Sequence, residues 1–248
     1  MSQLTGKTIV VTGAGRGLGR AFAQACCEAG ARVVIGELRM DLAGQAAAEL
    51  AEQGFQAEAL PLDVGDTDSV DAFAAAVRDR FGRVDGLVNN AAIATGIGGK
   101  GYDEIDVETF DRVMRVNVRG LWLVVKAMVP LMERGGIVNL ASDTALWGAP
   151  RLLHYVASKG AVISMTRSLS RELGPKGIWV NALAVGLTRV EATEYVPAER
   201  HALYENGRSI NRPQYPEDVV GSAVFLLSDA ASFVTGQVLP VNGGFVFN

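Results

Sequence analysis

The sequence is poor in the residues that metal sites and disulfide frameworks require. It holds two cysteines and two histidines among 248 residues. Cys26 and Cys27 are adjacent on an expected helix, where their side chains point about 100° apart. No spacing of cysteine, histidine and aspartate resembles a metal site. The cysteine pair therefore indicates a reduced, cytoplasmic protein without a disulfide framework or a bound metal.

Basic clusters, long apolar runs and a signal sequence are also missing. The formal net charge is -4, and a nucleic-acid surface would need grouped Lys and Arg. The N-terminus MSQLTGKTIVV lacks the charged, apolar and cleavage regions of a signal peptide. The longest apolar stretch, residues 121–132, is interrupted by Lys126 and is too short to span a bilayer. We therefore expect no nucleic-acid or membrane partner.

What the sequence does have is a large share of core-forming residues. Hydrophobic residues make up 49% of the chain and charged residues 20%, which is typical of folded α/β proteins. Strands are expected at residues 8–11, 32–36, 59–62, 85–88, 137–141, 178–183 and 237–241. Helices are expected at residues 18–29, 41–53, 67–81, 109–132, 152–173 and 217–227. This alternation predicts a Rossmann-type, doubly wound parallel sheet of seven strands in a three-layer α/β/α arrangement, as one domain over residues 1–248.

A glycine-rich turn, TGAGRGLG, follows the first expected strand. Its glycines fit the pattern G-x-x-x-G-x-G rather than G-x-G-x-x-G. Such a turn lets the backbone approach a pyrophosphate and aims a helix N-terminus at its charge. The turn predicts a dinucleotide site, with a plain glycine-rich turn as the alternative. The loop residues expected at the cofactor are Gly13, Arg16, Gly17, Leu18 and Gly19.

The second expected strand leads to Glu37, about 20 residues beyond the glycine loop. A carboxylate there can accept hydrogen bonds from ribose hydroxyls and would repel a 2′-phosphate, which favours NAD over NADP. Arg16 and Arg39 could instead reach a 2′-phosphate. NAD is therefore the expected cofactor, and NADP is the alternative.

Three residues with acid–base potential lie in the stretch NLASDTALWGAPRLLHYVASK, residues 139–159. Tyr155 and Lys159 are one turn apart on an expected helix, and an ammonium group near a phenol favours the phenolate. This lowers a pKa of about 10 toward the range of a general base. Ser142 ends an expected strand, where an α/β sheet presents side chains to a ligand. A surface Tyr-Lys pair is the alternative, so the interpretation depends on a cofactor site nearby.

The motifs together resemble the short-chain dehydrogenase/reductase family, in order and over essentially the whole chain. They are TGAGRGLG, LDV, NNAA, the Asn in RVNVRG, Ser142, YVASK and DAASFVTGQVLPVNGG. The resemblance implies reversible hydride transfer between NAD(H) and a secondary alcohol or its ketone. Tyr155 would be the general acid/base, and Lys159 would lower its pKa and bind the nicotinamide ribose. Ser142 would bond the substrate oxygen, and Asn117 would hold a water of the proton relay.

The same resemblance implies further cofactor contacts. Asp63 and Val64 would contact the adenine, while Asn89 and Ala91 would lie along the cofactor. The sequence also departs from the family pattern, because Ala92 replaces a usual glycine and Asn242 a usual aspartate.

A third departure follows the sixth expected strand. The usual Pro-Gly is Val185-Gly186 here, and Val190 stands where the family has a threonine near the nicotinamide amide. Thr188 could take over that contact, so Gly186 and Thr188 are expected at the cofactor.

The segment 187–216 has no clear periodicity and is expected to be a substrate lid. The pocket residues expected are Ser142, Asp143, Thr144, Trp147, Tyr155, Val185 and Leu187. This set is largely apolar and indicates a medium-sized, partly apolar or ring-bearing secondary alcohol rather than a phosphorylated or highly charged one. Arg189, Arg208 and Arg212 could serve a single carboxylate.

Several side chains near this pocket have more than one interpretation. His154 is expected to pack or to face solvent, and His201 to be solvated. Trp147 could belong to the core or to the pocket wall. Tyr195 and Tyr204 could cover a substrate or pack the lid onto the domain.

The long expected helices look too apolar for solvent, which suggests subunit contacts. Similar family members are commonly homotetramers, so a homotetramer or homodimer is expected. Alternatives to the dehydrogenase are an NADP-dependent ketoreductase acting on 3-oxoacyl or sugar substrates, an epimerase or dehydratase with bound NAD, and a non-catalytic nucleotide-binding regulator. The apolar residues that carry the assembly interpretation are Leu121, Trp122, Val124, Val125 and Ile163.

Overall fold

Parallel strands form one sheet in the computed structural model, which describes residues 3–247. In spatial order they are β3 (Ala57–Pro61), β2 (Arg32–Glu37), β1 (Thr8–Thr12), β4 (Gly86–Asn89), β5 (Gly135–Ser142), β6 (Ile178–Val185) and β7 (Val238–Val241). The strand order reverses between β1 and β4, which pair directly. In open α/β sheets, ligands bind beyond the carboxyl ends of the strands at such a reversal. The predicted seven-stranded, doubly wound sheet is confirmed.

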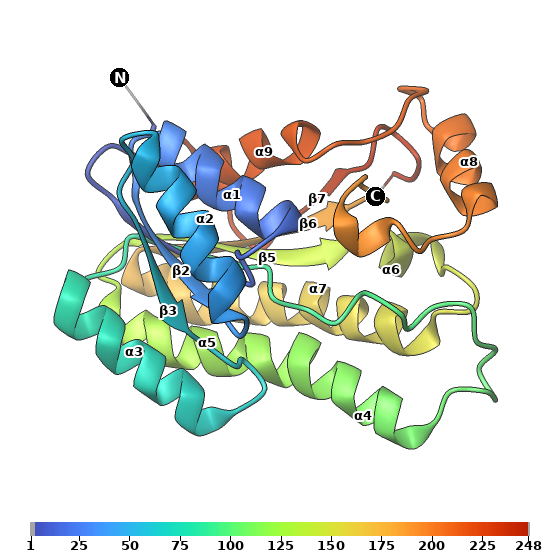
Figure 1. Cartoon of the computed structure of the whole chain (residues 1–248), viewed down its shortest axis with the longest axis horizontal. Coiled ribbons are helices and arrows are strands. Elements are labelled where there is room, and N and C mark those ends of the chain that lie inside the picture. The colour runs from blue at the N-terminus through green and yellow to red at the C-terminus, as the bar shows by residue number, and fades with distance from the viewer. Residues whose placement is uncertain (1–2, 248) are drawn as a thin grey trace.

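Helices cover both faces of the sheet (Figure 1). One face carries α1 (Gly17–Glu28), α2 (Met40–Glu52) and α9 (Glu217–Leu227). The other carries α3 (Thr67–Phe81), α4 (Val107–Met114), α5 (Leu121–Met128) and α7 (Leu153–Leu173). Strands covered on both faces are apolar along their whole length rather than alternating, and β1, TIVVT, is buried at every position.

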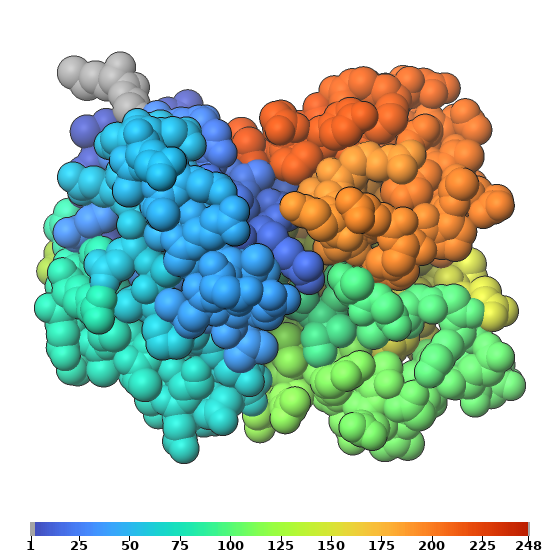
Figure 2. Space-filling view, in the orientation of Figure 1, coloured from blue at the N-terminus to red at the C-terminus, as the bar shows by residue number. Residues whose placement is uncertain are grey.

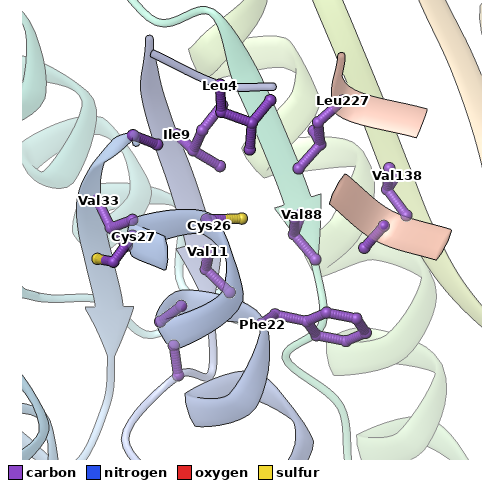
Figure 3. Packing of buried hydrophobic residues seen from close by; sticks show 14 of the residues in the cluster. Leu4, Ile9, Val11, Phe22, Cys26, Cys27, Val33, Val88, Val138 and Leu227 are labelled. Atoms are coloured by element: carbon purple, nitrogen blue, oxygen red, sulfur yellow. The ribbon is translucent and has the colours of Figure 1, made fainter. Parts of the chain in front are cut away.

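The core under α1 shows how the sequence builds this layer (Figure 3). Phe22 and Cys26 lie on one face of α1. Both pack in the same buried cluster as Val11 of β1 and Val88 of β4. Cys27 is also buried, and burial raises the pKa of its thiol to about 11. Both cysteines are free thiols that act as small core residues.

Element ends follow local signals where those signals are strong. The predicted helices 67–81 and 217–227 have the observed bounds of α3 and α9. Asp66 caps α3 by accepting a hydrogen bond from the Ser69 amide at 3.0 Å. The predicted helix 109–132 instead begins at Val107, behind the capping residue Asp106, and is not continuous.

That long helix is interrupted by a wider turn. α4 runs into a π-helix, Arg115–Gly120, and then into α5 and a 3₁₀ turn, Val129–Leu131. Pro130 in that turn cannot continue an α-helix. π-Helical turns are rare in proteins, but those that occur are often at functional sites. This one carries Asn117.

Two short helices were missed. α6 (Thr144–Trp147) follows β5 directly, and α8 (Ala198–Gly207) lies inside the segment expected to lack periodicity. The inward residues of α8 are His201 and Tyr204, whose polar atoms hide the apolar spacing that marks a helix. Across residues 3–247 no helix is both long and apolar enough to cross a membrane.

The apolar helix residues proposed for subunit contacts mostly lie inside the molecule. Leu121, Val124, Val125 and Ile163 are buried in the core beneath the sheet. Trp122 is 46% exposed and is the one of the five that faces outward. The assembly interpretation was therefore wrong for four of its five residues.

Candidate active site

The glycine loop at the start of α1 is built for close backbone approach. Gly13 and Gly17 have φ of 65° and 55°, a region that favours glycine. A side chain at Gly13 would place its Cβ 2.8 Å from the Ala91 Cα, and one at Gly19 would meet the Gly13 carbonyl oxygen at 2.1 Å. These positions therefore accept only glycine.

The N-terminus of α1 has the donors that a pyrophosphate needs. Within the described residues, Arg16 at the N-cap makes no side-chain capping bond, and the first turn holds no acidic residue. In α3 and α4, by contrast, Asp66 and Asp106 accept hydrogen bonds from amides of the first turn. Free amides at a helix N-terminus favour a phosphate, so this loop fits a dinucleotide.

Glu37 lies beside this loop at the end of β2. Its carboxylate accepts hydrogen bonds from the amides of Gly15, Leu38 and Arg39, at 3.1, 2.9 and 3.1 Å. Arg39 itself forms a two-point ion pair with Asp41, at 3.2 and 2.7 Å. The carboxylate is thus held at the loop, while the neighbouring guanidinium is turned to another partner.

The end of β4 is tied to the glycine loop by a residue that sequence reasoning missed. The Asn90 side-chain amide donates to the carbonyl oxygens of Thr12 and Gly13, at 3.0 and 2.9 Å. The Ala91 amide donates to the Thr12 hydroxyl at 3.0 Å. The second Asn of NNAA was the available signal, since an amide side chain next to a glycine turn can bond its backbone.

The other residues expected along the cofactor lie at the ends of neighbouring strands. Asn89 is buried and donates to the Asn139 side chain at 2.9 Å. Asp63 follows β3 and accepts from the Gly65 amide at 2.8 Å, with Val64 buried between them. Parallel strands bring their carboxyl ends to one edge, so these residues share the edge with the glycine loop.

Tyr155 and Lys159 lie one turn apart on α7, as expected. The Lys159 Nζ atom is 5.6 Å from the Tyr155 ring centroid and donates to the Leu140 carbonyl oxygen at 2.6 Å. Leu140 belongs to β5, which ends at Ser142 two residues later. The structure therefore brings all three predicted residues to the end of β5.

Asn117 joins this group through the π-helical turn. Its side chain accepts from the Ile93 amide at 2.7 Å and donates to the Ser158 hydroxyl at 3.1 Å. Ser158 in turn donates to the Tyr155 carbonyl oxygen at 2.7 Å. The turn thus locks an amide side chain against the helix that carries Tyr155 and Lys159.

Burial controls the ionisation of these groups. It raises the pKa of Tyr155 above its usual value, a hydrogen bond with Ser142 opposes this, and the Asp143 charge adds to it. Burial also lowers the pKa of Lys159 to about 8. Lys159 is therefore still mostly cationic at neutral pH, which favours a nearby phenolate.

Ser142 is oriented by the residue two places later. The Thr144 hydroxyl and amide both donate to the Ser142 Oγ atom, at 2.9 and 3.3 Å. Ser142 itself donates a long bond of 3.4 Å to the Val185 carbonyl oxygen, and its hydroxyl is also hydrogen-bonded to Tyr155. The long bond can therefore be exchanged for one to a better acceptor.

Asp143 points into the protein rather than outward. It is fully buried, and its Oδ1 atom accepts a hydrogen bond from the Tyr204 hydroxyl at 3.0 Å. Trp147 packs edge-on against Tyr204 and against Phe245, with centroids 6.3 and 5.7 Å apart. Trp147 and Tyr204 therefore hold α8 and the C-terminal segment on the end of β5.

The lid contacts the loop after β4 at the edge of the sheet where the cofactor is expected. The Tyr195 hydroxyl donates to the Ala94 carbonyl oxygen at 2.6 Å, and the Thr95 hydroxyl to that of Ala192 at 3.3 Å. In Figure 2 the orange lid and the green segment after β4 lie against dark blue atoms near the middle of the view. A pocket between the lid and the start of α1 is lined by residues of both, among them Gly17, Arg189 and Glu191.

The residues at the base of the lid are mostly buried or hydrogen-bonded to other residues of the chain. Val185 and Gly186 are buried, Leu187 is half-buried, and the Thr188 hydroxyl donates to the Gly186 carbonyl oxygen at 3.0 Å. His201 was expected to be solvated, and this is wrong. It is buried on α8, with Nε2 3.3 Å from the Thr193 carbonyl oxygen.

His154 packs inside the protein, which is one of the two positions predicted for it. It is fully buried, and neither ring nitrogen has a hydrogen-bond partner among residues 3–247. Burial lowers the pKa of this imidazole. His154, the residue before Tyr155, is therefore a neutral side chain packed inside the protein.

Comparison with known proteins gives consistent matches over the chain. The family model described as Enoyl-(Acyl carrier protein) reductase matches residues 13–246. A 2,5-dichloro-2,5-cyclohexadiene-1,4-diol dehydrogenase of Sphingobium indicum is 38% identical over 252 residues, 99% of each chain.

Solved structures agree with this. A short-chain dehydrogenase/reductase, glucose/ribitol dehydrogenase from Brucella melitensis, superposes with a TM-score of 0.93 at 33% identity, over 99% of each chain. A structure assigned to an NAD(P)-dependent gluconate 5-dehydrogenase of Beutenbergia cavernae, with NADP at low occupancy, has a TM-score of 0.91 at 38% identity, over 98% of each chain.

Proposed function

This chain belongs to the short-chain dehydrogenase/reductase family, and we propose that it moves hydride reversibly between NAD(H) and a medium-sized, partly apolar or ring-bearing secondary alcohol or its ketone. It is an oxidoreductase that acts on CH–OH groups. The observation that carries the proposal is the meeting of Ser142, Tyr155 and Lys159 at the end of β5. The uncapped glycine loop shares their sheet edge.

Oxidation of the alcohol breaks one C–H and one O–H bond. NAD, when bound, would supply the hydride acceptor. Tyr155, as phenolate, takes the hydroxyl proton, while Ser142, oriented by Thr144, donates a hydrogen bond to the substrate oxygen and keeps its own proton. Lys159 offsets the negative charge of the phenolate and would bind the nicotinamide ribose. By the family resemblance, Asn117 would hold a water through which the proton leaves.

NAD is favoured over NADP by the environment of Glu37. Its carboxylate is fixed beside the glycine loop, where a 2′-phosphate would meet like charge. Arg39, the alternative phosphate partner, is held by Asp41. Arg16 is exposed and free to turn, and it is what supports the NADP-dependent alternative, together with the NADP bound to the Beutenbergia relative.

The cofactor preference is measured as the ratio of kcat/KM for NAD to that for NADP. We expect NAD to be preferred by the unmodified protein, and Glu37→Ala to reduce that preference by at least about 10-fold, since removing a charge contact is worth 1.4 kcal/mol or more. Arg16→Ala serves as the matched variant and should leave NAD kinetics close to normal. A native preference for NADP would overturn the assignment.

The substrate lies between the strand ends and the lid of residues 187–216. The side chains of Val185, Leu187 and Trp147 offer it apolar surface, and Thr144 acts through Ser142. Of the relatives named above, one is named for a ring diol, which supports a ring-bearing alcohol, and the others are named for glucose or ribitol and for gluconate, which support the sugar-type alternative.

A spectrophotometric screen of NAD reduction tests the substrate class. It should include aliphatic, cyclic and aromatic secondary alcohols, sugars and small hydroxy acids. A hydrophobic pocket discriminates by only ~1–3 kcal/mol per methylene, so several related alcohols should react. If only sugars or small, wholly polar hydroxy acids react, the apolar pocket is wrong.

A further inference from the structure

Among residues 3–247, the guanidinium of Arg200 in the lid has no ionic partner. It lies in the first turn of α8, with its Cζ atom 5.7 Å from the Trp147 ring centroid. Its Nη2 atom is buried and has no hydrogen-bond partner within residues 3–247. A buried charged donor left unpaired is unfavourable, so a rotation of this side chain that brought Nη2 to an acceptor would be favoured.

The other lid arginines are differently engaged. Arg189 pairs with Glu205 at 2.6 Å, and Arg212 binds both oxygens of Asp218, at 2.7 and 2.5 Å. Arg208 is buried and donates to the Leu187 carbonyl oxygen at 2.8 Å, among other acceptors. The three arginines expected to serve a carboxylate are thus occupied.

Arg200 is close to the catalytic end of β5. It lies one helical turn before Tyr204, whose hydroxyl bonds Asp143, the residue after Ser142. Burial raises the pKa of Tyr195, and the charge of Arg200 opposes this. Arg200 is therefore connected to the end of β5 through the Trp147 ring and through Tyr204.

We propose that Arg200 binds a carboxylate at the far end of the substrate, while the apolar part of the substrate lies against Trp147. The inference rests on the proposed function and narrows its substrate class to hydroxy acids in which a ring or chain separates the carbinol from the carboxylate. A guanidinium matches a carboxylate with two parallel hydrogen bonds.

The test compares two substrates that differ only in charge, 4-hydroxycyclohexanecarboxylate and its methyl ester. For the unmodified protein, kcat/KM should be about 10- to 100-fold higher for the acid, as for one hydrogen bond to a charged group. Arg200→Gln should bring the ratio close to 1 by raising KM for the acid, with the ester little changed. Arg200→Lys should keep part of the preference. Arg171→Gln removes an equal charge at an exposed position on α7 and should keep all of it.

Binding gives a second measurement that does not depend on turnover. Calorimetry on the Tyr155→Phe protein with NADH should show tighter binding of the acid than of the ester, and Arg200→Gln in that background should abolish the difference. Equal binding, or no binding of the acid, overturns the role of Arg200, while turnover of the ester would still support the dehydrogenase. Tight binding of the acid without turnover of either compound by the unmodified protein would support Arg200 and contradict the proposed ring-bearing substrate class.

Discussion

At the residue scale, the chemistry depends on one phenol in an unfavourable environment. Burial raises the pKa of Tyr155, and the Ser142 hydrogen bond only partly opposes this. The cation of Lys159, 5.6 Å from the ring, is therefore needed to make the phenolate accessible.

Replacing Tyr155 by Phe keeps the ring and removes the proton carrier. Turnover should fall by at least the roughly 10²–10⁴-fold typical of acid–base catalysis, because the alcohol proton has no acceptor. NAD binding, followed by protein fluorescence, should be retained. Near-normal turnover in this variant would contradict the role of Tyr155.

Asp143 is a second titrating group at the same site. Burial raises its pKa to about 7, and the Tyr204 hydrogen bond and the Arg208 charge oppose this. The ordinary value is near 4, so between about pH 4 and pH 7 the unfolded chain is ionised while the folded chain stays protonated. Folding then becomes less favourable as the pH rises through this window.

Asp143→Asn removes this dependence and keeps an acceptor for Tyr204. Urea unfolding should show the variant gaining stability relative to the native protein from pH 4 to pH 7, by at most about 4 kcal/mol. The acidic limb of kcat/KM should also move to lower pH, because the Asp143 charge raises the pKa of Tyr155. A constant stability difference and an unmoved limb would contradict the buried carboxyl's role.

At the element scale, the parts of the fold that were predictable from the sequence are those with strong local signals. Strand runs such as TIVVT and caps such as Asp66 act over a few residues and are visible in the letters. The π-helical turn at Asn117 depends on packing between α4, α5 and α7, which no local pattern encodes.

In the candidate site, too, the residues with a strong local signal could be predicted and the others could not. Ser142, Tyr155 and Lys159 follow from strand and helix register, since the register fixes which edge they reach. Asn90 and Arg200 were missed because their importance comes from partners far away in the chain, the glycine loop and Trp147. The burial of His201 and Tyr204 likewise depends on α8 folding back onto the end of β5.

Arg208, at the C-terminal end of α8, attaches this helix to the rest of the protein. It is buried and donates to the carbonyl oxygens of Leu187, Arg212 and Asn242 and to the Gln214 side chain. Arg208→Met would leave these acceptors unpaired and should cost roughly 2–3 kcal/mol. Hydrogen exchange should rise over residues 187–216 and KM should increase, while exchange in α2 and α3 stays as in the native protein. Uniformly faster exchange would indicate global destabilisation instead of a released lid.

At the scale of the whole molecule, the layers leave an apolar surface uncovered on the helices of the second face. A groove of about 480 Å³ lies against α4, the π-helical turn, α5 and α7. Its lining is Met114, Arg115, Val118, Arg119, Trp122 and Met165. Exposed apolar surface of this kind marks an interaction site, and it lies on the helices that carry Asn117 and Tyr155.

We propose a homotetramer, or a homodimer, built on this groove, with Trp122 at its centre. Trp122 is 46% exposed, and Lys126 lies over its ring at 5.5 Å, so a partner could bury both the ring and the lysine stem. Light scattering at micromolar concentration should return a multiple of the 26.2 kDa chain mass. Trp122→Glu places a charge in the buried interface and should shift the mass to that of the monomer, while Tyr102→Glu, at a position 80% exposed on a loop, should not. A monomer mass for the unmodified protein would refute the assembly, and dissociation without loss of kcat would separate it from the catalytic role of Asn117 and Tyr155.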